Sequence, residues 1–183
     1  MKQKHCCPWW AGYFLVNPLR RLFQKPEVIL GSFVRKGMIV LDLGCGMGFY
    51  SIAMARMVGS EGKVISVDIQ QKMLDNLRRR AQRANVLDRI TTHLAQANEI
   101  GIKEKVDFAL AMWMVHEVGE TEKFLAQVKA CLKENGRFLI VEPKMHVGRK
   151  SYQKTIKLAE ECWLKMVERP KVGLNHAAVL ALI

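Results

Sequence analysis

The chain has 183 residues, of which half are hydrophobic and a quarter are charged. That length suits one folding domain, and the composition excludes a disordered or low-complexity protein. The five cysteines include no CxxC pair of the kind that binds zinc or exchanges disulfides. We therefore expect a reduced, cytoplasmic protein without a metal site.

Positive charge dominates the sequence, with 29 lysines and arginines against 17 acidic residues and a formal net charge of +12. This excess of positive charge is compatible with an anionic partner such as nucleic acid. Its densest run, Arg78 to Arg80 with Arg83, falls on the polar back of an expected helix, where we expect solvated side chains. No stretch is long and apolar enough to span a membrane. The sequence does not indicate an oligomeric state.

The first 35 residues precede any expected strand. Pro18 and Pro26 stand where helices begin, so one or two helices are expected here. The apolar start has no small-residue cleavage site, and we expect no secretory signal. An aromatic and thiol-rich cluster lies within it, and either covers a substrate site as a lid or packs against the domain. Its members are Cys6, Cys7, Trp9, Trp10 and Tyr13.

From Met38 onward, short β-branched runs alternate with stretches of helical period, which predicts a parallel sheet covered by helices. The expected strands are Met38–Leu43, Lys63–Ile69, Ile90–Leu94, Val106–Met112, Gly136–Glu142, Lys165–Val172 and Ala177–Ile183. A helix is expected over Ser151–Trp163, and Gly59, Asn135 and Gly136 are expected at helix ends. The fold class is therefore α/β with seven strands.

A glycine-rich turn follows the first strand in the run Val40-Leu41-Asp42-Leu43-Gly44-Cys45-Gly46-Met47-Gly48. Ligands of open α/β sheets bind beyond the carboxyl ends of the strands, where glycines allow close backbone approach. Asp68 ends the next strand and is placed to accept hydrogen bonds from ribose hydroxyls. The G-x-G-x-G spacing disfavours a dinucleotide, whose third glycine would fall at Phe49.

These motifs together resemble the class I S-adenosylmethionine-dependent methyltransferases of small-molecule type, akin to the ubiquinone/menaquinone-biosynthesis and arsenite enzymes. The resemblance covers about residues 26–183 and implies a Rossmann-like three-layer sandwich whose seven-stranded, mostly parallel sheet has its last strand antiparallel. One methyltransferase domain over 1–183 is expected, with a helical or lid segment at 1–35 and the core at 36–183.

The resemblance also assigns residues to the cofactor S-adenosylmethionine. Its methionine part would lie in the turn with Gly44, Cys45, Gly46 and Gly48, and Asp42 would reach its ammonium group. Asp68 would bind the ribose and Ile69 the adenine. The remaining contacts would come from Gln96 and Ala97, which stand where relatives have Asp-Ala, and from Met112 and Trp113 at the methyl end.

Three residues near the ends of the fourth and fifth strands are candidates for a general base, namely His116, Glu142 and His146. The sulfonium is already an activated methyl donor, so positioning of the acceptor can suffice for catalysis. Each candidate has a structural alternative, since His116 can cap a helix, Glu142 can bind loop backbone and His146 can be solvated.

The expected function is methyl transfer to a small-molecule acceptor. A methyltransferase acting on RNA or protein remains an alternative because of the charge, and so does a non-catalytic cofactor-binding protein.

Overall fold

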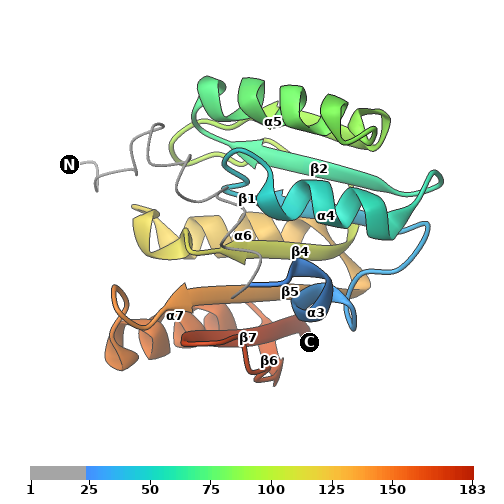
Figure 1. Ribbon diagram of the computed structural model, residues 1–183. Helices are drawn as coiled ribbons and strands as arrows, with labels where there is room; N and C mark the ends of the chain where they lie inside the picture. The colour runs from blue at the N-terminus through green and yellow to red at the C-terminus, as the bar shows by residue number, and fades with distance from the viewer. Residues whose placement is uncertain (1–23) are drawn as a thin grey trace. The chain divides into compact units, whose positions relative to one another are not determined.

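A computed structural model describes residues 24–183 (Figure 1). Its seven strands belong to one mostly parallel sheet in the order β3-β2-β1-β4-β5-β7-β6, flanked by helices. The expected fold class is thus confirmed. The described residues fall into two compact units, 24–95 and 96–183, which we describe one at a time. The expected single domain stays a prediction.

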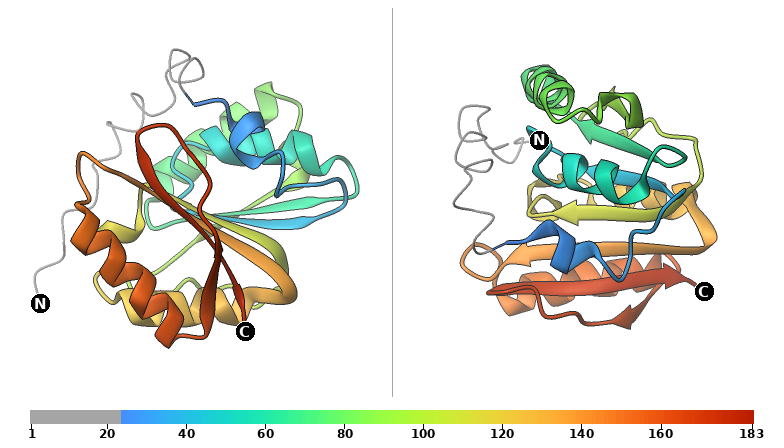
Figure 2. Two further views of the ribbon diagram at one scale, coloured as in Figure 1. Left: turned by 90° about the horizontal axis from the view of Figure 1, so that it is seen from below. Right: turned by 45° about the vertical axis from the view of Figure 1, so that its right-hand side comes forward.

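The unit of residues 24–95 holds a three-stranded parallel sheet. Its elements are α3 (Pro26–Leu30), β1 (Ile39–Leu43), α4 (Phe49–Val58), β2 (Lys63–Asp68), α5 (Gln71–Arg83), the 3-10 helix η2 (Leu87–Arg89) and β3 (Ile90–Leu94). Pro26 begins α3, as expected. The parallel register sets Leu43 beside Val67, so the ends of β1 and β2 lie side by side. Helices α4 and α5 cover one face of these strands (Figure 2).

The unit of residues 96–183 holds the other four strands. Its elements are β4 (Val106–Met112), the 3-10 helix η3 (Val115–Glu117), α6 (Thr121–Cys131), β5 (Leu132–Pro143), α7 (Arg149–Glu161), β6 (Leu164–Glu168) and β7 (Asn175–Leu182). Strands β4 and β5 are parallel, whereas β7 runs antiparallel to both β5 and β6. The expected antiparallel last strand is confirmed. Helices α6 and α7 lie on one face of this sheet (Figure 2).

Strands β1, β2 and β4 and the second half of β5 are buried because their sequences are nearly continuous apolar runs, whereas β3 and β6 are largely accessible. Leu110 on β4 and Leu139 on β5 are fully buried, as are Phe108 and Phe138. A strand covered on both faces needs no alternating polar positions. Only Ser66, Asp42, Asp68 and Glu142 bring polar atoms into the buried part of the strands.

The expectation for Asn135 and Gly136 was wrong. Helix α6 ends at Cys131, and β5 begins at Leu132 and runs through both residues. Neither has a left-handed backbone, whereas Gly59 does, with φ of 71° at the end of α4. Pairing of Leu132 with Val106 on β4 extends the strand toward its amino end. Within residues 24–183, no helix is long and apolar enough to cross a membrane.

Gly48 and Gly37 offer a matched test of packing at the glycine turn. Their φ angles are 78° and 79°. A Cβ at Gly48 would lie 2.6 Å from Leu77 Cγ, whereas one at Gly37 would meet nothing within 4 Å. We expect Gly37→Ala to lower the free energy of unfolding by about 1–2 kcal/mol for the left-handed backbone. Gly48→Ala should lose about 1–3 kcal/mol more from overpacking. Urea denaturation measures both, and equal losses would contradict the packing argument.

Candidate active site

The glycine-rich turn, residues 44–48, joins β1 to α4 at the carboxyl end of β1. Its backbone is held against β2, because Cys45 N–H donates to the Val67 carbonyl at 3.0 Å. Gly44, Gly46 and Gly48 all have positive φ, of 65°, 52° and 78°. Three left-handed residues within five make a tight turn that side-chain-bearing residues adopt only at a cost.

The turn is closed on one side and open on the other. Leu77 of α5 fills the space behind Gly48. A Cβ built on Gly46, by contrast, would point into open space with no atom within 4 Å. The backbone at Gly46 is therefore exposed to close approach by a ligand, in the manner expected of a glycine cradle.

Asp68 holds this turn in place from the end of β2. Its Oδ2 accepts a hydrogen bond from Gly46 N–H at 2.9 Å, and its Oδ1 accepts one from Gln70 N–H at 2.9 Å. Burial raises the pKa of Asp68, although the donors of Gln70, Gly46 and Ile69 oppose that shift. Each carboxylate oxygen has a second lone pair, so Asp68 can still accept from hydroxyl groups of a ligand.

Asp42, two residues before the turn, is a nearly inaccessible carboxyl group on β1. It is 2% exposed and accepts a hydrogen bond of 2.5 Å from the Ser51 hydroxyl of α4. Burial raises the pKa of Asp42 to about 7, with a further upward contribution from Asp68, whereas Ser51 lowers it. Near neutral pH this group is poised between its two charge states, and a cation bound nearby would favour the carboxylate.

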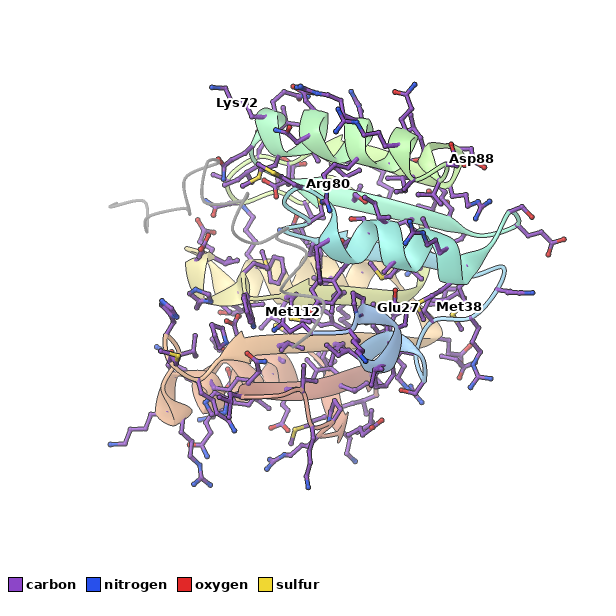
Figure 3. The ribbon with its side chains drawn as sticks, in the orientation of Figure 1. Glu27, Met38, Lys72, Arg80, Asp88 and Met112 are labelled. Carbon is purple, nitrogen blue, oxygen red and sulfur yellow. The ribbon has the colours of Figure 1, made fainter. Side chains whose placement is uncertain are left out.

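Arg80 corrects the expectation of a solvated arginine run on α5. Arg80 is labelled in Figure 3. Its guanidinium donates to the Met47 carbonyl inside the turn, and burial lowers the pKa of Arg80. Arg78, Arg79 and Arg83 are exposed as expected, and Arg78 also donates to the Thr92 hydroxyl at 2.8 Å. Leu77 and Arg80 share a helix face because they are three residues apart, and together they support the turn.

A second group of polar residues lies in the unit 96–183, where β4 and β5 end. His116 Nδ1 lies 2.5 Å from Glu142 Oε2, and His116 N–H donates to Glu142 Oε1 at 3.1 Å. Glu142 is 2% exposed, whereas the His116 side chain is 28% exposed. The buried carboxylate therefore orients a partly accessible imidazole, which is the arrangement of a general base with its positioning group.

Aromatic side chains accompany this histidine–glutamate pair. Trp113 follows β4 with φ of 60°, and its indole N–H donates to Asn175 Oδ1 at 2.8 Å. His176 is the register partner of Glu142 on β7, and Tyr152 of α7 stacks on its ring with centroids 4.7 Å apart. Burial raises the pKa of Tyr152 to about 12, with Glu142 adding to the shift and Arg169 opposing it. The Tyr152 phenol therefore stays protonated near neutral pH.

An open groove of about 740 Å³ is lined by residues of η3, α6 and α7, His116 among them. Its lining is mostly polar, with hydroxyl groups and charged side chains beside a few apolar residues, namely Thr121, Ser151, Thr155, Glu120, Glu122, Lys123, Lys154, Val115 and Leu158. Ligand sites typically have volumes of this order. An acceptor in the groove could contact His116.

The remaining sequence-predicted residues are placed as follows. Gln96, Ala97 and His146 are exposed, Ile69 is 48% exposed, and Cys45 and Met112 are buried. Among residues 24–183, no hydrogen bond joins the His146 ring to the His116–Glu142 pair. Cys6, Cys7, Trp9, Trp10 and Tyr13 lie outside the described residues.

Several residues of the site carry no local sequence signal. Ser51, Arg80, Tyr152, Asn175 and His176 each contact a predicted site residue or the turn from another element. Tertiary packing brings them to the site from elements distant in the sequence, and no local pattern predicts such contacts.

The turn fits the adenosyl and methionine parts of S-adenosylmethionine on its own features. Gly46 leaves backbone open to a ligand, Asp68 keeps lone pairs for hydroxyls, and Asp42 offers a negative charge for an ammonium group. Within the described part of the chain, no three His, Cys, Asp or Glu side chains gather as metal ligands would.

Comparison with known families identifies the chain. Residues 34–173 match the family described as a methyltransferase domain, which spans most of the chain. The chain therefore belongs to the methyltransferase domain family, and the family and fold together imply S-adenosylmethionine as its cofactor.

Individual relatives agree with this assignment. The chain is 32% identical over 124 residues to a demethylmenaquinone methyltransferase of Symbiobacterium thermophilum, covering 67% of this chain and 49% of the relative. It is 33% identical over 148 residues to a ribosomal protein L11 methyltransferase of Dictyoglomus thermophilum, covering 76% and 46%. The chain thus spans about half the length of these relatives.

A solved structure shares the whole fold. The crystal structure of a SAM-dependent methyltransferase from Aquifex aeolicus superposes with a TM-score of 0.88, covering 97% of this chain and all of that one, at 24% identity. At this identity, the likeness shows the fold.

Asp42 makes the stability of the free protein depend on pH. Its pKa is about 7 in the folded protein and 3.8 in an unperturbed aspartate, so between these values the folded protein holds a proton that the unfolded chain has released. Raising the pH through this window lowers the free energy of unfolding, by at most about 1.4 kcal/mol per pH unit. Asp42→Asn cannot ionise at this position. As the pH rises from about 5 to about 8, we therefore expect its free energy of unfolding to fall less than that of the parent.

Urea denaturation of both proteins across that pH range measures the difference between their free energies of unfolding. Contributions from the other titrating groups are common to both proteins and cancel in this difference. Ser51→Ala is the companion variant, because removing its hydrogen bond should move the transition to higher pH. Identical pH profiles for the parent and Asp42→Asn would contradict the raised pKa.

Proposed function

We propose that this chain binds S-adenosylmethionine at the glycine turn and transfers its methyl group to a small-molecule acceptor. The observation that carries the proposal is the open backbone at Gly46, fixed by the carboxylate of Asp68. The methyltransferase family of the chain supports it.

The chain's own groups have distinct roles in cofactor binding. Gly44, Gly46 and Gly48 bring backbone N–H and carbonyl groups to the methionine part, and Asp42 receives the ammonium group directly or through water. Asp68 accepts from the ribose hydroxyls, and Ile69 contacts the adenine. The remaining cofactor contacts come from Gln96, Ala97, Met112 and Trp113. When bound, the cofactor supplies a methyl group already activated by its positive sulfur.

The small-molecule acceptor is favoured by the relatives and by the groove. Several relatives are named demethylmenaquinone methyltransferase or ubiquinone/menaquinone biosynthesis C-methyltransferase. The groove beside His116 offers a volume suited to a small molecule.

We assign the base role to His116. Its ring is partly accessible, and the Glu142 carboxylate holds both its Nδ1 and its backbone N–H. Because Nδ1 is held by Glu142, a proton taken from an acceptor hydroxyl or acidic carbon would go to Nε2. Glu142 positions His116 and stabilises the charge that the ring gains.

Asp68→Ala tests the cofactor site. We expect it to weaken S-adenosylmethionine binding by about 1.5–3 kcal/mol, or roughly 10- to 150-fold, because it removes hydrogen bonds to a charged acceptor. Isothermal titration calorimetry with S-adenosylmethionine and S-adenosylhomocysteine measures the loss. Gly46→Ala should also lose binding, because its Cβ would occupy the open space of the cradle.

Asp88→Ala is the control, since the Asp88 side chain is 67% exposed and lies outside the turn. It should bind as the parent does. Tight binding of a nicotinamide dinucleotide in place of S-adenosylmethionine would refute the proposed cofactor. If Asp68→Ala bound S-adenosylmethionine as tightly as the parent does, the assignment of the ribose contact to Asp68 would be wrong.

His116→Ala tests the base. Loss of a general base typically lowers the rate of the chemical step by about 100- to 10,000-fold. We expect kcat to fall in this range while the affinity for S-adenosylmethionine is retained. Glu142→Gln should lower kcat as well, and the double variant should lose little beyond His116→Ala, because Glu142 acts through His116.

Methyl transfer from labelled S-adenosylmethionine to demethylmenaquinone measures these rates, with ribosomal protein L11 as a comparison acceptor. His146→Ala is the matched variant and should keep activity, since its exposed ring is not held by Glu142. If His146→Ala lost activity and His116→Ala kept it, the base would be misassigned.

A further inference from the structure

Two loops leave the same end of the β5–β7 ladder, where Pro143 and Asn175 are register partners. One loop follows β5 and enters the first turn of α7, over residues 144–150. The other joins β6 to β7, over residues 169–174. We call these two segments the basic rim. Their common origin places them together at one end of the unit 96–183.

The basic rim carries positive charge without compensation. Its five cations are all exposed, namely Lys144, Arg149, Lys150, Arg169 and Lys171. The two segments contain no aspartate or glutamate. None of the five is ion-paired to a carboxylate in the described part of the chain, and Arg169 instead donates to the Met166 sulfur at 3.2 Å.

Each loop of the basic rim also presents an apolar side chain to solvent. Met145 is 91% exposed and Leu174 is 82% exposed, the highest values among the large hydrophobic residues that the structure describes. Both loops are nevertheless well anchored, because Val147 and Val172 are buried at 4% and 5%. The Val147 N–H also donates to the Pro143 carbonyl, and the Asn175 N–H to that of Val172.

We infer that the basic rim docks on an anionic lipid surface. The five cations would contact lipid phosphates, and Met145 and Leu174 would enter the boundary between headgroups and acyl chains. Charge complementarity selects this occupant, because uncompensated cations surround the two apolar tips. The tips are aliphatic, whereas proteins that bind single-stranded nucleic acid present aromatic side chains for base stacking.

Docking in this way has a consequence for the acceptor. Glu142 immediately precedes the Pro143 end of one loop, and His176 follows the Asn175 end of the other. A lipid surface on the rim would therefore lie next to the His116–Glu142 pair, which favours an acceptor dissolved in the bilayer. This consequence rests on the proposed function, whereas the docking itself requires no methyl transfer.

Vesicle sedimentation of the full chain without cofactor tests the docking. We expect binding to phosphatidylcholine vesicles that contain phosphatidylglycerol, weakening with salt, and much weaker binding to phosphatidylcholine alone. The pair Met145→Asp with Leu174→Asp should bind at least about tenfold more weakly, because its tips no longer enter the apolar boundary. The pair Lys144→Glu with Lys171→Glu should lose at least about tenfold as well.

Control variants separate the rim from the overall positive charge. Lys36→Glu with Lys103→Glu makes the same charge change at exposed positions outside the rim, and Val28→Asp places a charge at another exposed apolar residue. Both should bind vesicles within a fewfold of the parent. A far-UV circular dichroism spectrum and a urea midpoint close to those of the parent show that each variant is folded.

Three results would overturn the inference. The first is no vesicle binding by the parent. The second is equal binding by the rim and control variants, which would mean that net charge alone acts. The third is binding of a single-stranded RNA oligonucleotide that the lysine pair abolishes and the aspartate pair leaves intact. Failure of methyl transfer with intact vesicle binding would count against the proposed function only.

Discussion

The carboxylate of Asp68 is the interaction on which the ordered glycine turn depends. The turn has few side chains of its own to hold its left-handed backbone, and Asp68 supplies the missing restraint through Gly46 N–H. The same group binds Gln70 N–H at the start of α5, so one side chain links the loops that follow β1 and β2. Its position follows from the β1–β2 register, since a slip by one residue would turn Asp68 to the other face of the sheet.

That arrangement lowers the stability of the free protein. Asp42 and Asp68 are both buried, and each is a carboxyl group whose charged form is disfavoured by burial. A core of apolar residues at these positions would avoid this penalty. Perturbed carboxyl groups gathered at the ends of strands are typical of binding sites, where a ligand's positive charge and hydroxyl groups offset the cost.

Much of the fold could be predicted because most strands are short apolar runs rich in β-branched residues. Strands β3 and β4 have the bounds that the sequence indicates. The start of β5 could not be predicted, because Asn135 and Gly136 look locally like a helix end, whereas pairing with β4 extends β5 through both residues. In the candidate site, the glycine turn and its two acids have a local spacing signal. The contacts of Arg80 with Met47 and of His116 with Glu142 join residues 33 and 26 positions apart, which helical period and spacing do not relate.

Trp113 adopts a left-handed backbone, with φ of 60°, that its side chain makes costly. A bulky residue in this region carries strain of about 1–3 kcal/mol, and such strain persists where neighbouring contacts enforce it. Here the Trp113 N–H donates to Val141 and its indole to Asn175. Glycine would adopt the same backbone without strain but would lose the indole and its hydrogen bond to Asn175. Replacement of Trp113 by glycine would therefore act on the backbone and on the ring contacts in opposite directions, and the two effects would partly cancel in the free energy of unfolding.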